Sequence, residues 1–140
     1  MAPHKKRLAH AREIATPYPF LRVIEPESGL PDNYTYNTLK YMKKTMPLSR
    51  LIWVMGADSL GQFARWHRYR DMIRLLPIAV VDRPSYSFKA IATGRQLLGR
   101  RTRVTKMRYA ISTRTVNLPS WCFIAGQLNA ASATEIRQRT

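Results

Sequence analysis

The sequence lacks the features of several protein classes. Among 140 residues it has one cysteine, Cys122, which excludes a disulfide within the chain, and it shows no Cys and His spacing of a zinc site. No apolar run approaches the roughly 20 residues of a membrane-spanning helix, and the charged segment 1–12 lacks the apolar stretch of a secretory signal. We therefore expect a cytoplasmic protein with a single domain over residues 1–140 and with Cys122 in its core.

Acidic residues are scarce as well. The chain has 24 Lys and Arg against 8 Asp and Glu, a net charge of +16, and no acidic residue stands between Asp82 and Glu135. Such an excess favours anionic partners such as phosphates, nucleotides or nucleic acid. A solvated basic surface is the commoner explanation of a charge run, so composition alone assigns no partner.

The apolar pattern alternates between strand-like and helix-like segments. Short apolar runs predict strands at 20–24, 51–55, 78–81 and 121–124. Amphipathic spacing and proline breakers predict helices over 3–14, 36–46, 70–76 and 88–98, and helices that begin at Ser59 and Thr134. This alternation predicts an α/β fold with a parallel sheet, in which ligands bind at the carboxyl ends of the strands.

Two candidate sites follow the predicted strand 51–55. In the segment 56–60, small residues let a ligand approach the backbone and Asp58 offers acceptors for ribose hydroxyls, although a helix cap by Asp58 explains the segment more simply. The segment 66–69 sets Trp66 beside cationic and hydrogen-bonding groups. This arrangement suits stacking on a pyridine or purine ring, but it is also typical of core packing.

Two further candidates lie at predicted helix starts. Thr35 and its neighbouring N–H groups can hold a carboxylate, although capping of the helix is the simpler interpretation. Ser132, Thr134 and Arg137 surround the start of the last helix, where they can cradle phosphate oxygens or form a cap with a solvent-facing Arg. Each motif is weak singly, and the order of the motifs along the chain is the stronger signal.

In this order the motifs resemble those of the bacterial nicotinate mononucleotide adenylyltransferases, a branch of the Rossmann-like nucleotidylyltransferase superfamily. The family motifs Y-T-x-[DN]-T-L and G-[AQ]-D-[SAN]-L match the segments 34–39 and 56–60, and F-x-x-W with a following aromatic matches Phe63, Trp66 and Tyr69. Two later motifs match with one change each: R-P-G ends here in Ser85, and I-S-[SA]-T-x-I-R begins here with Ala131. The match runs over nearly the whole chain, so the resemblance implies a Rossmann-like nucleotidylyltransferase fold.

The resemblance also implies a reaction and a set of binding residues. The family transfers the adenylyl group of ATP to nicotinate mononucleotide, giving deamido-NAD and pyrophosphate, with Mg²⁺ assisting. By this resemblance we expect the nicotinate mononucleotide to be bound by Thr35, Trp66 and Tyr69. We expect ATP to be bound by Asp58, Arg83, Ser132, Thr134 and Arg137.

One defining family element is absent from the 140 residues. The motif G-x-F-x-P-x-H-x-G-H, whose histidines bind ATP phosphates in the family, does not occur, so no catalytic residue is assigned. In a Rossmann-like sheet the first strand is central, and its loss exposes two edges. We therefore expect that translation starts upstream of Met1, and that the 140-residue chain, lacking its first strands, is poorly soluble and inactive. A remnant of a decayed gene is the alternative.

Two other functions remain open. The acid-free stretch 83–114 suggests a basic RNA-binding module, but of the aromatics such a module needs, only Tyr86, Phe88 and Tyr109 lie there. A related adenylyltransferase acting on the amide nucleotide or on phosphopantetheine would lack the motifs at 34–39 and 66–69. The resemblance therefore favours ATP and nicotinate mononucleotide as partners over nucleic acid or a membrane, and it leaves a homo-oligomer open.

Overall fold

The structure is a computed structural model that describes residues 4–26, 30–32, 34–83 and 86–126. The chain divides into two compact units, residues 1–33 and 34–140. Among the described residues, no helix is both long and apolar enough to span a membrane.

In the described part of the first unit lies the helix α1 (His4–Ala15), which has no buried residue. The helix ends ahead of Pro17, where Thr16 Oγ1 donates a hydrogen bond of 2.9 Å to the carbonyl of Arg12. The strand predicted at 20–24 is wrong: Phe20 lies in a turn, residues 21–24 form no strand, and Phe20 is 79% exposed. An apolar run becomes a strand only where a partner completes its hydrogen bonds, and no described segment of this unit does so.

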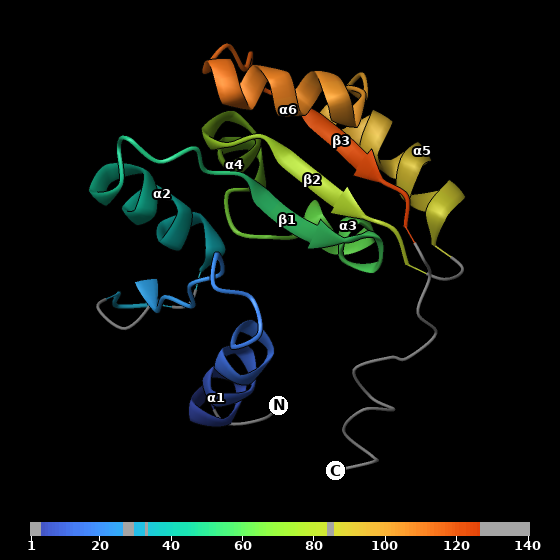
Figure 1. Cartoon of the computed structure of the whole chain (residues 1–140). Coiled ribbons are helices and arrows are strands. Elements are labelled where there is room, and N and C mark those ends of the chain that lie inside the picture. The colour runs from blue at the N-terminus through green and yellow to red at the C-terminus, as the bar shows by residue number, and fades with distance from the viewer. Residues whose placement is uncertain (1–3, 27–29, 33, 84–85, 127–140) are drawn as a thin grey trace. The chain divides into compact units, whose positions relative to one another are not determined.

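The second unit is built on a parallel sheet of three strands in the order β1-β2-β3 (Figure 1). These strands are β1 (Trp53–Gly56), β2 (Ile78–Val81) and β3 (Trp121–Ile124). In register, Gly56 lies opposite Val81, and Val81 lies opposite Ile124. The carboxyl ends of the three strands are therefore level, and the predicted α/β fold with a parallel sheet is confirmed.

Helices connect and cover the strands. Four of them lie where amphipathic spacing predicts helices: α2 (Thr35–Thr45), α3 (Ala57–Phe63), α4 (Tyr69–Leu75) and α5 (Ser87–Leu98). A further helix, α6 (Val104–Thr113), is not among the predicted elements. Val104, Met107 and Ile111 give α6 an apolar face that packs on the sheet, and basic residues on its other face obscure this spacing in the sequence.

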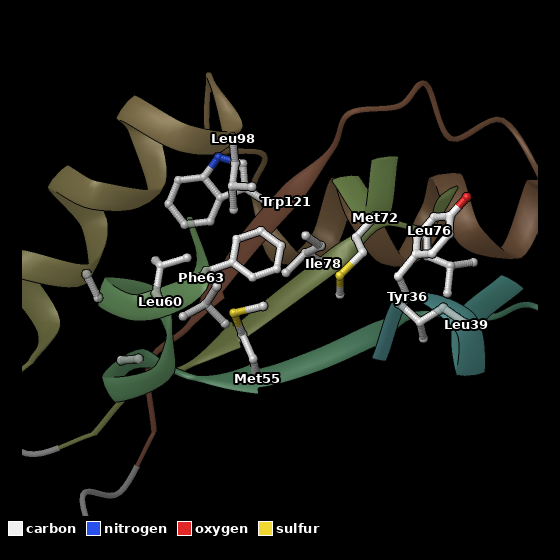
Figure 2. Packing of buried hydrophobic residues seen from close by; sticks show 13 residues of the cluster. Tyr36, Leu39, Met55, Leu60, Phe63, Met72, Leu76, Ile78, Leu98 and Trp121 are labelled. Atoms are coloured by element: carbon white, nitrogen blue, oxygen red, sulfur yellow. The ribbon is translucent and has the colours of Figure 1, made fainter. Parts of the chain in front are cut away.

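The two faces of the sheet carry different clusters because side chains alternate along each strand. Ile78, Val80 and Trp121 point into the larger cluster with α3 and α5, shown in Figure 2. Ala79 and Cys122 point to the opposite face, against Met107 of α6. Cys122 is 2% exposed, as expected for a core residue.

Candidate functional site

Two strand ends bring a carboxylate and a guanidinium together. Asp58 follows β1, Arg83 follows β2, and Asp58 Oδ1 lies 3.6 Å from Arg83 Nε. Both side chains are about half exposed. A Cβ on Gly56 would overlap Asp58 Oδ1 and would lie 3.1 Å from Arg83 Nε, so glycine is what allows both groups to close over the end of β1.

The predicted capping role of Asp58 is wrong. The N-cap of α3 is Gly56, with no side-chain cap, and Asp58 lies in the first turn of the helix. A carboxylate there is favoured by the helix dipole, but it makes no capping hydrogen bond and faces Arg83 instead. Its oxygens therefore remain at the open edge of the sheet, where a ligand can reach them.

A second carboxylate at this edge was not predicted. Asp82 directly follows β2, and its Oδ1 accepts hydrogen bonds from Ser87 Oγ at 2.6 Å and from the Arg83 backbone N–H at 2.8 Å. Its own N–H donates to the Ile124 carbonyl at 2.9 Å. Asp82 thus joins the ends of β2 and β3 to the start of α5, and an acidic residue directly after a buried strand was the signal that could have identified it.

An aromatic cluster surrounds Trp66. Its ring meets Trp53 edge-on at 6.4 Å between centroids and Phe63 at 5.6 Å, and Tyr69 meets Phe63 at 5.7 Å. Trp66 and Tyr69 are half-buried and pack against the larger core cluster, so they contribute to the core and keep part of their surface open. The Tyr69 hydroxyl accepts a hydrogen bond from Arg70 Nε, which raises the pKa of the Arg70 guanidinium above its ordinary value.

The start of α2 lies against the chain beside Trp66. Tyr34 stacks on His67 with centroids 4.5 Å apart, Tyr36 meets the same ring edge-on, and the Arg68 guanidinium lies 4.5 Å over the Tyr36 ring. Thr35 is the first residue of this helix, whose first turn has no acidic residue. The predicted cap is not formed by a side chain. The structure therefore brings the helix start at Thr35 next to the cationic and aromatic segment that contains Trp66.

Three predicted phosphate-binding residues, Ser132, Thr134 and Arg137, lie outside the described residues. The remaining predicted residues form two groups in the second unit. Asp58 and Arg83 are in direct contact. Trp66 and Tyr69 both pack against Phe63, and Thr35 follows Tyr34, whose ring stacks on that of His67, the residue after Trp66.

Comparison with known proteins finds several relatives of similar name. The chain is 36% identical over 139 residues to a probable nicotinate-nucleotide adenylyltransferase of Methylorubrum extorquens, covering 99% of this chain and 74% of the relative. It is 33% identical over 134 residues to a protein of the same name from Ruegeria sp., covering 96% and 70%. A Brucella abortus relative, also of that name, is 32% identical over 138 residues, covering 99% and 70%. No protein-family model matches the chain.

Proposed function

Because the chain belongs to the nicotinate-nucleotide adenylyltransferase family, we propose that its role is the transfer of the adenylyl group of ATP to nicotinate mononucleotide. A phosphate oxygen of the mononucleotide attacks the α-phosphorus of ATP, and the bond to the bridging oxygen of the β-phosphate breaks. Deamido-NAD and pyrophosphate are the products. Such a reaction depends on aligning two anionic partners and stabilising the charge on the transferring group, so it needs no covalent enzyme intermediate.

The observation that carries this proposal is the Asp58–Arg83 pair over Gly56 at the carboxyl end of the sheet. Ligands of open parallel sheets bind at this edge. Arg83 supplies a permanent positive charge for a phosphate, and the Asp58 oxygens accept hydrogen bonds from ribose hydroxyls. We assign both residues to ATP, with Ser132, Thr134 and Arg137 as further phosphate ligands.

The nicotinate end of the other substrate fits the second group of residues. Backbone N–H groups in the first turn of α2, around Thr35, favour a carboxylate because the positive end of the helix dipole lies there. The half-open face of Trp66, with Tyr69 close by, suits a pyridine ring. This pairing distinguishes the acid from the amide, because a neutral amide gains less at a helix N-terminus.

Mg²⁺ enters this scheme with ATP. Among the described residues no group of three or more His, Cys, Asp and Glu side chains could hold a metal ion. Mg²⁺ needs no such cage, since it is commonly held by substrate phosphates, waters and one or two carboxylates. When bound, the ion would neutralise charge on the phosphates, and Asp58, whose side chain is 44% exposed beside Arg83, would offer a carboxylate for an outer contact.

The 140 residues contain no H-x-G-H motif, and this separates two parts of the proposal. Binding of nicotinate mononucleotide depends on residues within the described part of the second unit. Rapid adenylyl transfer depends on groups that stabilise the transition state, each worth about 10²–10³ in rate. We therefore expect the 140-residue chain to bind nicotinate mononucleotide and to release no pyrophosphate above background when ATP is added.

Calorimetric titration of the 140-residue chain with nicotinate mononucleotide, and separately with its amide, tests this function. We expect the acid to bind more tightly, Trp66→Ala to weaken its binding by at least about tenfold, and Trp66→Phe to retain most of the affinity. Tyr109→Ala is the matched control, because Tyr109 is 69% exposed on α6 and is not part of the cluster. Equal affinity for acid and amide, or equal effects of Trp66→Ala and Tyr109→Ala, would contradict the assignment.

A further inference from the structure

A cavity of about 660 Å³ lies at the outer edge of β3, where α5 ends and α6 begins. Its lining includes neither Asp58 nor Arg83, and none of the residues in ring contact with Trp66. Four arginines contribute to the lining, together with a hydroxyl, a turn and two apolar side chains: Arg95, Arg100, Arg101, Arg103, Thr102, Gly99, Val104 and Phe123.

Hydrogen bonds to Trp121 of β3 hold this edge of the cavity in place. The buried Trp121 indole N–H donates to the Gly99 carbonyl at 2.9 Å, and the Thr102 N–H donates to the Trp121 carbonyl at 2.8 Å. Gly99 has a φ of 81°, a conformation that side chains rarely adopt, and it turns the chain from α5 toward these contacts. The backbone of segment 99–103 is thus fixed to the sheet, and this fixes where the side chains of its arginines begin.

The positive charge around the cavity is not neutralised by the described part of the chain. All four arginines are exposed, and none of them forms an ion pair with a described residue. The sequence holds no acidic residue between Asp82 and Glu135. The first turn of the ten-residue helix α6 also lacks an acidic residue and a side-chain cap, and its N–H groups add to the positive potential.

We propose that this cavity binds the linear phosphate chain of a small molecule, such as a nucleoside triphosphate. Guanidinium groups hold phosphate oxygens through paired, charge-assisted hydrogen bonds, and several phosphates in a row match several arginines around one hollow. The volume lies within the usual range of small-molecule sites. Val104 and Phe123 give part of the wall an apolar surface against which a base can rest.

The geometry favours a small ligand over RNA. Single-stranded RNA is bound by exposed aromatic side chains spaced along a basic groove. The aromatic residue of this cavity, Phe123, is half-buried and packs against the core cluster, so it cannot present both faces to successive bases. A compact phosphate chain makes no such demand.

Calorimetry with inorganic tripolyphosphate, ATP and adenosine tests the proposal on the 140-residue chain. The variant R100Q/R101Q/R103Q removes three positive charges from the cavity lining. The variant R65Q/R74Q/R108Q removes three exposed positive charges outside the lining, so both variants lower the net charge of +16 by the same amount. We expect tripolyphosphate and ATP to bind, adenosine alone not to bind, and the cavity variant to bind tripolyphosphate at least about tenfold more weakly. The matched control should stay within about threefold of the original chain.

Further measurements locate the bound phosphate chain. Amide NMR shifts of Thr102, Val104 and Phe123 should follow the tripolyphosphate titration, and they should persist in Arg83→Gln, which alters only the site proposed for ATP beside Asp58. In the Arg83→Gln chain, tighter binding of ATP than of tripolyphosphate identifies a nucleotide, and equal binding identifies the phosphate chain alone; both support the proposal. Equal losses in the two triple variants, loss of binding in Arg83→Gln alone, or tighter binding of a short single-stranded RNA would overturn it.

Discussion

The packing of Gly94 against Trp121 allows a stability prediction whose sign opposes helix propensity. Gly94 lies within α5, where alanine is intrinsically favoured over glycine by about 1 kcal/mol. A Cβ at Gly94 would overlap Trp121 Cη2 and would lie 2.8 Å from Cζ2 and Cζ3. Trp121 is completely buried, and its indole N–H is tied to the Gly99 carbonyl, so the ring has no free direction in which to move.

Overpacking a core of this kind costs about 1–3 kcal/mol, and the severe overlap places Gly94→Ala at the upper end of that range. Displacing the ring also strains or breaks the hydrogen bond to Gly99, which is worth about 1 kcal/mol. After the gain in helix propensity, we expect Gly94→Ala to lower the free energy of unfolding by about 2–3 kcal/mol. At this chain length the midpoint of thermal unfolding should fall by about 10 °C.

Gly61→Ala is the matched control for this prediction. Gly61 lies in α3 and is exposed, and a Cβ added there would have no neighbour within 4 Å, so alanine should raise the unfolding free energy by about 0.5–1 kcal/mol. Urea denaturation followed by circular dichroism and by tryptophan fluorescence measures both variants. If Gly94→Ala stabilised the protein as Gly61→Ala does, the close packing of α5 on Trp121 would be wrong.

Two further predictions concern the sheet. Gly56→Ala displaces the exposed end of the Asp58 side chain and not a buried ring, so the free energy of unfolding should change by less than about 1 kcal/mol. The NMR shifts that ATP induces at the Asp58 and Arg83 amides should weaken. A large loss of stability would contradict this reasoning. Burial raises the pKa of the Cys122 thiol, so little thiolate is present at neutral pH. Its reaction with a disulfide reagent should therefore be slow in the folded protein, faster as the pH rises, and fastest after denaturation. Rapid labelling of the folded chain at neutral pH would show that Cys122 is accessible.

The three strands of the sheet could be predicted from the sequence because each is a short, continuous apolar run. The runs at 51–55, 78–81 and 121–124 place apolar residues in the clusters on both faces of the sheet, although Val54 of β1 remains 53% exposed, and a continuous apolar run is a local signal. The run at 20–24 is also rich in apolar residues, but pairing is a non-local condition, and Phe20, Leu21 and Ile24 stay exposed. Helix α6 was not predicted because few of its positions are buried, and these stand among basic residues that indicate an exposed segment.

The site shows the same division between local and non-local information. A small or polar residue after a strand is a local cue, and the level carboxyl ends of β1 and β2 explain why the cues at Gly56, Asp58 and Arg83 converge. The capping interpretation of Asp58 failed because helix propensity describes one element at a time, whereas the partner of this carboxylate comes from the next strand. A carboxylate that caps its own helix has its acceptors committed to backbone N–H groups. Gly56 takes the cap position, and Asp58 faces an exposed cation instead. The carboxylate oxygens of Asp58 are therefore free of backbone capping bonds, as they must be in a residue that accepts hydrogen bonds from a ribose.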